Sequence, residues 1–250
     1  MNDFSDKEWA IRVDLAAAFR LVDWYGWSDL LATHLSARVP DESDHFLINP
    51  FGLMFDEITA SSLVKVNKIG EKVSSSEYEI NPAGFVLHGA IHSKISNVNC
   101  VIHTHTASGL GVASQKQGLL PLNQQALSII AHTSYHSYNG ITFDPSEQDS
   151  IANDLNDKNI LILKNHGLVS VGASIGEAFM WMYRAERACR FQLAFQQTNS
   201  EPETISNEIQ QKTINANIKA NSHSGYRTIG VIEWPALKRK LDRENPGYET

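Results

Sequence analysis

The sequence contains little cysteine. Of its 250 residues only Cys100 and Cys189 are cysteine, and they lie far apart in apolar surroundings. No Cys-x-x-Cys pair or zinc-finger spacing occurs, so we do not expect a disulfide framework. Two buried free thiols in a reducing cytoplasm are the simpler expectation.

Long apolar runs are also missing, and no uninterrupted stretch reaches the roughly 18 residues that a transmembrane helix needs. The first twenty residues carry acidic side chains where a secretory signal would carry basic ones. Acidic residues outnumber basic ones, 28 to 21, which gives a formal net charge of −7. This balance argues against binding to nucleic acid or to anionic membranes. We therefore expect a cytoplasmic protein whose partner is a small molecule.

What the sequence does have is the composition of a globular domain, with 42% hydrophobic and 20% charged residues. Segments with helical periodicity alternate with short strand-like runs, which predicts one α/β domain over residues 1–197. The predicted helices are 5–27, 84–95, 107–118, 145–157 and 174–197. The predicted strands are 34–40, 45–50, the end of 58–67, 99–106 and two runs within 159–172.

The C-terminal part differs in composition. Residues 198–224 are polar and rich in Asn and Gln, which predicts a linker or mobile segment. Residues 225–250 are more apolar and include Trp234, so we expect this tail to pack on the domain or on a neighbouring subunit.

Three histidines form a candidate metal site. His103 and His105 are two apart in a predicted strand, so their side chains point to the same face. His166 follows the apolar run Leu-Ile-Leu and is flanked by Asn165 and Gly167, which predicts a tight turn at a strand end. Two imidazoles from one strand and a third from another match three-histidine metal sites that keep an open position.

The remaining histidines have weaker signals. His88 and His92 are four apart on a predicted helix and share a face, which fits either a pocket or core packing. His34 precedes a strand and is a candidate for the pocket. The others are expected on the surface or in loops: His45, His132, His136 and His223. Glu186 is expected to be solvated or at a subunit interface.

These motifs carry a family resemblance. The stretch VIHTHT, followed about 60 residues later by KNHGLVSVG, resembles the class II aldolase/adducin family, and the likeness extends through YGWSDLLATHLSARVP, NPAGFVLHGAIHSK and EWPALKRKLDRENPGY. The resemblance implies a three-layer fold with a central, mainly antiparallel β-sheet flanked by helices, and a homotetramer with its sites at subunit interfaces. It also implies a divalent metal held by His103, His105 and His166. Zn²⁺ is favoured, with Fe²⁺, Co²⁺, Ni²⁺ and Mn²⁺ as alternatives.

The sequence departs from the sugar-phosphate aldolases of that family in one pocket. Their catalytic glutamate position is Gly84 here, and the serines before it are Pro82 and Ala83. The asparagine of their GN-x-S motif is His34, although Ser36 remains. Their phosphate-loop threonine is Phe51. The pocket therefore lacks the acid and the phosphate-binding hydroxyl groups, and a substrate without phosphate is expected.

Three functions remain open from the sequence. The first is a metal-dependent lyase, of aldolase or decarboxylase type, acting on a small non-phosphorylated oxo-acid or hydroxy-acid, with His34 and Ser36 as pocket candidates and no assigned catalytic group. The second is a non-catalytic binding or structural module similar to the adducin head. The third is an Fe(II)-dependent oxygenase that uses the same three histidines.

Overall fold

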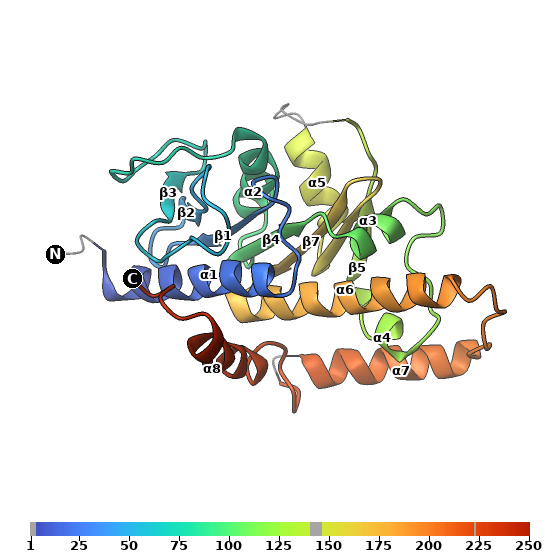
Figure 1. Cartoon of the computed structure of the whole chain (residues 1–250). Coiled ribbons are helices and arrows are strands. Elements are labelled where there is room, and N and C mark those ends of the chain that lie inside the picture. The colour runs from blue at the N-terminus through green and yellow to red at the C-terminus, as the bar shows by residue number, and fades with distance from the viewer. Residues whose placement is uncertain (1–3, 141–146, 223) are drawn as a thin grey trace.

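A computed structural model describes residues 4–140, 147–222 and 224–250. Its centre is a seven-stranded sheet in the order β3-β2-β1-β4-β7-β6-β5 (Figure 1). All neighbours pair antiparallel except β5 and β6, which are parallel. The strands are β1 His34–Arg38, β2 His45–Ile48, β3 Val64–Asn67, β4 Cys100–Thr104, β5 Thr133–His136, β6 Ile160–Leu163 and β7 Gly167–Gly172. The expected mainly antiparallel sheet is confirmed.

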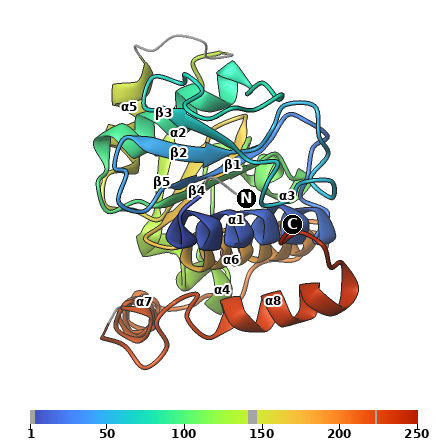
Figure 2. The same ribbon diagram turned by 90° about the vertical axis from the view of Figure 1, so that its left-hand side faces the viewer.

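Helices cover both faces of the sheet. Helices α2 and α5 pack on one face and α1 and α6 on the other, with α7 and α8 outside them (Figures 1 and 2). The helices are α1 Asp6–Trp24, α2 Pro82–Lys94, α3 Ala107–Ala113, α4 Gln124–Leu127, α5 Glu147–Leu155, α6 Ile175–Gln196, α7 Asn207–Asn221 and α8 Glu233–Glu244, with a 3₁₀ turn at Ile130–His132. The layered arrangement is that of an α/β domain in which every apolar sheet face is covered.

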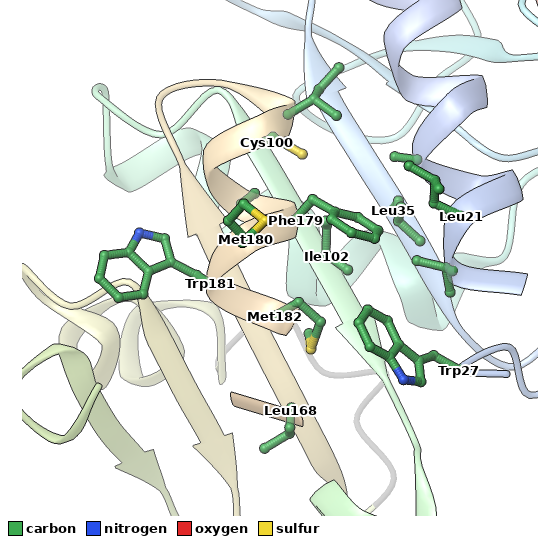
Figure 3. Packing of buried hydrophobic residues seen from close by; sticks show 14 of the residues in the cluster. Leu21, Trp27, Leu35, Cys100, Ile102, Leu168, Phe179, Met180, Trp181 and Met182 are labelled. Atoms are coloured by element: carbon green, nitrogen blue, oxygen red, sulfur yellow. The ribbon is translucent and has the colours of Figure 1, made fainter. Parts of the chain in front are cut away.

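Alternation along β4 divides the core in two. Cys100 and Ile102 belong to the large cluster under α1 and α6, whereas Val101 belongs to the cluster under α2 and α5. Figure 3 shows Ile102 beside Phe179 of α6 in the large cluster. His103 lies on the same side of the strand as Val101. The site therefore forms on the face that α2 covers.

Capping side chains and glycine residues mark where the helices begin and end. Ser5 caps α1 by accepting a hydrogen bond from the amide of Glu8, and the chain turns at Gly26, whose φ is +69°. Helix α3 ends at Ala113, earlier than predicted, because Gly118 closes a separate turn in which its amide donates to the Gln115 carbonyl. The predicted Pro145 start of α5 lies outside the described residues.

The C-terminal segments contain two helices, α7 and α8. Within 198–224, predicted as a linker or mobile segment, α7 begins at the capping Ser206 and runs to Asn221. Polar residues can form such a helix on a surface when a cap and tertiary contacts stabilise it. Helix α7 contacts α4, and α8 contacts α1 and α6, so part of the expected tail packs on the domain.

Two expectations drawn from the composition concern the state of the cysteines and the apolar character of the helices. Cys100 and Cys189 are free and buried. Burial raises the pKa of both thiols, which keeps them protonated. In the described ranges, no helix combines the length and apolar character needed to cross a bilayer.

An ion-paired group under α1 ties that helix to the loop before β3. Arg12 is fully buried. Its Nε–H donates to the Glu8 carboxylate at 2.9 Å, and its Nη1–H donates to the Leu63 carbonyl at 2.8 Å. Lys65 donates to the other carboxylate oxygen of Glu8 at 3.0 Å. Because a buried charge is costly without its partner, this group couples α1 to the sheet.

Replacing Glu8 with alanine should therefore be strongly destabilising. The change leaves the Arg12 guanidinium buried without a counter-charge, and we expect the free energy of unfolding to fall by about 3–5 kcal/mol. Chemical denaturation measures this. Lys7→Ala is the matched control, because its ion pair with Asp41 is largely exposed, at 68% and 72%. Equal losses for the two variants would contradict the account.

Candidate metal centre

The three predicted histidines meet at one point in the structure. His103 lies in β4, His105 follows that strand directly, and His166 lies in the turn between β6 and β7. One nitrogen from each ring can be chosen such that all three lie within 4.8 Å of one another. The ring centroids are 4.6 to 4.9 Å apart. The strand ends at Thr104, one residue before His105, so β4 is shorter than predicted.

A tight turn holds His166 against β4. Asn165 takes a left-handed conformation with φ +57°, and the amide of His166 donates to the Leu163 carbonyl at 3.0 Å. A Cβ at Gly167 would lie 2.4 Å from the Thr104 carbonyl oxygen. Glycine is therefore required where β7 starts beside β4, and this close approach brings His166 to the other two rings.

The second nitrogen of two of these rings already has a partner. The Nδ1–H of His103 donates to the Leu168 carbonyl at 2.9 Å. Nδ1 of His105 lies 3.1 Å from the Asp29 carboxylate, to which it also donates. Because both acceptors require a hydrogen on Nδ1, each neutral ring presents an unprotonated Nε2. This is how proteins usually fix the tautomer of a metal-binding histidine.

The two Nε2 atoms lie only 2.8 Å apart. Neutral rings with Nδ1–H would point two lone pairs at each other there, which is unfavourable unless a cation lies beside both. The donor set is therefore one that a divalent metal fits, with His166 as the third ligand.

The environment keeps two of these imidazoles neutral, those of His103 and His166. Burial lowers the pKa of His103 well below its usual range, and neighbouring histidines lower it further. Burial, together with His105 and His136, lowers the pKa of His166 to about 4. At neutral pH both rings are in the form that binds a metal.

A cavity of about 550 Å³ opens beside the three histidines. Its apolar wall comes from α2, α3, α5 and β6. Its polar lining is Asp29, His34, Asn81, His103, His105, His136, Ser137, Tyr138, Asn139, Lys164, Asn165 and His166. Asp29 is the one carboxylate and Lys164 the one lysine or arginine among these described lining residues, which leaves little charge to bind a dianion.

The position of His136 differs from the one that the sequence predicts. It was expected in a loop or on the surface, but it lies in β5, is 7% exposed and lines the cavity. Its Nδ1 is 2.7 Å from the Asp154 carboxylate. Strand β5 pairs parallel with β6, and local sequence does not indicate this long-range pairing. The β-branched and aromatic residues of β5 do favour a strand. Asp29, which orients His105, was also missed.

A buried chain of hydrogen bonds runs from the cavity into the space between β1 and α2. We call His34, His88, Ser36 and His92 the histidine chain. Nδ1 of His34 lies 2.7 Å from Nε2 of His88, whose Nδ1 is hydrogen-bonded to Ser36 Oγ, and the same oxygen is 2.7 Å from Nε2 of His92. His34 thus lines the cavity as predicted, whereas Ser36 lies behind it.

Gly84 lies against this chain at the start of α2. A Cβ at position 84 would be 2.6 Å from Cδ2 of the His34 ring. A glutamate there would therefore need the His34 ring to move. The space beside Gly84 is filled by the imidazole of His34.

Glu186 also differs from its expected place. It is 1% exposed and accepts hydrogen bonds from the hydroxyl groups of Ser108, at 2.6 Å, and Thr106. Burial raises the pKa of its carboxyl group. Because Thr106 caps α3 directly after His105, Glu186 fixes the end of the segment that carries His103 and His105 to α6.

Comparisons with known proteins identify the family and the fold. The family model for the class II aldolase and adducin N-terminal domain matches residues 13–193. A Pseudomonas aeruginosa protein with a provisional class 2 aldolase name is 49% identical over 247 residues, covering 98% of this chain and 93% of its own. Rat alpha-adducin is 41% identical over 257 residues, covering 99% of this chain but 35% of adducin.

Two solved structures share the fold. An aldolase II superfamily protein from Pseudomonas syringae superposes with a TM-score of 0.91 at 41% identity, over 99% of this chain and 98% of that one. L-fuculose 1-phosphate aldolase from Glaciozyma antarctica gives a TM-score of 0.81 at 25% identity, over 97% and 93%.

The histidine chain predicts acid sensitivity of the metal-free protein. Burial lowers the pKa of His88 well below its usual range and that of His92 to about 3. Unfolded histidine takes up a proton below about pH 6.5, whereas these rings stay neutral in the fold. The free energy of unfolding should therefore fall as pH drops below about 6.5, by roughly 1.4 kcal/mol per pH unit for each of the two rings.

Denaturation of chelator-treated protein at pH 7.5, 6.5 and 5.5 measures this loss. The loss should be confined to the lower step. His45→Gln, at a partly exposed ring outside the chain, should keep the same slope. A free energy of unfolding that is flat between pH 6.5 and 5.5 would be incompatible with neutral buried rings.

Proposed function

The chain belongs to the class II aldolase and adducin family, and we propose that it is a metal-dependent lyase of aldolase or decarboxylase type. Its substrate is a small oxo-acid or hydroxy-acid without phosphate. The observation that carries the proposal is the 2.8 Å approach of Nε2 of His103 to Nε2 of His105, in rings whose Nδ1 atoms both face oxygen acceptors. In this proposal those two rings and His166 bind a divalent metal, with Zn²⁺ favoured.

A divalent cation at this position would supply a Lewis acid that stabilises negative charge developing on a carbonyl oxygen. The chain's own residues orient the ligands. The Leu168 carbonyl holds the ring of His103, and the Asp29 carboxylate holds that of His105. Val86 and Leu87 belong to the apolar wall, which limits water around the reacting groups.

The lining of the cavity supports a carboxylate substrate over a phosphate ester. Lys164 can pair with one carboxylate. The single cation, together with the nearby Asp29, is poorly suited to a phosphate dianion. The absence of serine and glutamate at positions 82–84 points the same way.

We further propose a cytoplasmic homo-oligomer, a tetramer by analogy with the family. The buried free thiols fit a reducing compartment. Neither nucleic acid nor a membrane is proposed as a partner.

A second candidate function is a non-catalytic module similar to the head of adducin. The observations that favour it are Gly84 at the position of the usual acid and the 41% identity to alpha-adducin. The lone-pair geometry of the histidines counts against it, because a purely structural domain has no need of an open metal site.

Metal analysis of the purified protein tests the proposal. We expect about one divalent metal per chain, and His103→Ala combined with His105→Ala should remove it, because two of three ligands are lost. Turnover should be sought with a panel of oxo-acids and hydroxy-acids, and chelation should abolish it. His45→Gln is the control and should keep full metal content.

The outcomes separate the candidates. Full metal retention in the double variant would reject the site. Metal bound without turnover of any carbonyl compound would favour the adducin-like module. Iron found after anaerobic purification, with oxygen consumed during turnover, would favour an Fe(II)-dependent oxygenase instead of a lyase.

A further inference from the structure

The cavity beside the three histidines is larger than a small oxo-acid requires. Its volume of about 550 Å³ lies within the range of roughly 300–1,000 Å³ that is typical of pockets for drug-sized ligands. A three-carbon oxo-acid at the histidines would leave most of this volume to water. The side chains that line the rest of the cavity therefore indicate what else the substrate carries.

One wall of the cavity consists of core residues. Leu87 of α2, Ile151 of α5 and Leu163 of β6 line the cavity and belong to one apolar cluster, between the sheet and these two helices (Figure 1). Each of the three is between 4% and 7% exposed. Val86 of α2 and Leu110 of α3 also line the cavity. These five residues are the apolar wall.

The apolar wall begins directly beside the candidate ligands. Leu163 is the last residue of β6, and its carbonyl accepts a hydrogen bond from the amide of His166 at 3.0 Å. Leu161 and Leu163 both belong to the cluster under α2 and α5, so the side chain of Leu163 lies on the same face of the sheet as the ring of His103. The polar and apolar parts of the cavity are thus continuous, and one molecule can contact both.

Helix α2 separates its polar side chains from its apolar ones. His88 and His92 are turned toward β1, where both are hydrogen-bonded to the Ser36 hydroxyl group. Among the described side chains of α2, those that line the cavity are Val86 and Leu87. Neither can form a hydrogen bond, so this side of the cavity offers no partner to a hydroxyl group of a ligand.

A substrate tail rich in hydroxyl groups fits the apolar wall poorly. A hydroxyl group that loses its water against an aliphatic surface, without a new hydrogen bond, raises the free energy of the complex. An apolar group, in contrast, is stabilised when it leaves water and covers aliphatic side chains. The chemistry of the wall therefore favours an apolar tail.

We propose that the substrate carries a bulky apolar group, branched or aromatic, which lies against the apolar wall while the oxo-acid end lies at the three histidines. This inference rests on the proposed lyase function and names the substrate class of the same site. Val86 and Leu110 are then specificity-determining residues, because they contact the part of the substrate that does not react. The preferred substrate is an oxo-acid or hydroxy-acid with an apolar tail, not a sugar acid.

Binding of oxo-acids that differ in their tails tests the proposal. The probes are pyruvate and 4-methyl-2-oxopentanoate, and titration calorimetry of the Zn²⁺-loaded protein measures both dissociation constants. We expect the branched acid to bind at least about 10-fold more tightly, because one methylene group in an apolar pocket is worth roughly 10- to 200-fold. Equal dissociation constants for these two acids would overturn the proposal.

A third probe separates the polarity of the tail from its size. In 2-oxosuccinamate an amide group replaces the branched end of 4-methyl-2-oxopentanoate with nearly the same shape. It should bind no more tightly than pyruvate, because the amide finds no partner at the apolar wall. Binding as tight as that of the branched acid would also overturn the proposal.

A matched pair of leucine variants locates the apolar group. Leu110 and Leu193 are both half-buried, but Leu110 lines the cavity, whereas Leu193 of α6 packs on the other core cluster and lies 2.8 Å from where a Cβ at Gly111 would be. Leu110→Asn should weaken binding of the branched acid about 10-fold, with metal content and pyruvate binding unchanged. Leu193→Asn should change neither dissociation constant.

Val86→Thr, which keeps the shape of the side chain, is the second variant where Leu110→Asn does not fold. It should likewise weaken binding of the branched acid and leave that of pyruvate unchanged. Equal weakening of both acids, or of neither, in the folded variants would reject binding at the apolar wall.

Failure of the proposed function gives a different result. A protein that prefers the branched acid but turns over no carbonyl compound rejects the lyase and keeps the site for the apolar group. Turnover at the same kcat/KM for substrates with apolar and with hydroxylated tails keeps the lyase and rejects that site.

Discussion

The antiparallel pairing of β1, β4 and β7 determines where every group of the site lies. It sets His34 opposite His103 on one side of β4, and Leu168 opposite Thr104 on the other. From β7 the Leu168 carbonyl reaches the His103 ring, and from β1 His34 reaches the cavity. A shift of one residue in either pairing would turn these side chains to the face of α1 and α6. The pairing of β4 with β7 requires glycine at position 167, because a Cβ there would clash with the Thr104 carbonyl oxygen.

The protonation of the histidine rings follows from this geometry. Two rings donate from Nδ1, so in their neutral form the Nε2 atoms that converge have no hydrogens, and burial keeps the ring of His103 neutral by lowering its pKa. Burial also keeps the rings of the neighbouring histidine chain neutral by lowering the pKa of His34, His88 and His92. The site is therefore rich in unprotonated nitrogen and poor in carboxylate. That is the reverse of a site built around a glutamate, and it is consistent with glycine at position 84, where the His34 ring leaves no room for a side chain.

The sequence was sufficient for the parts of this account that depend on short-range patterns. The alternation of His103 and His105, the turn around His166 and the Ser5 cap can be read from adjacent residues. The pairing of β5 with β6 cannot, and so His136 was misplaced. Asp29 and Glu186 act through contacts 76 and 80 residues away in sequence, which no local spacing encodes. The steric match between His34 and Gly84 also required the structure, because it joins a strand to a helix 50 residues later.

The central claim is that His103, His105 and His166 share a cation, and anomalous diffraction from crystals grown with Zn²⁺ tests it most directly. The account predicts one strong peak within about 2.0–2.1 Å of Nε2 of His103 and of His105, with a nitrogen of His166 completing the protein ligands. A structure with no peak there, and with one of the two Nε2 atoms donating a hydrogen bond to the other, would contradict it.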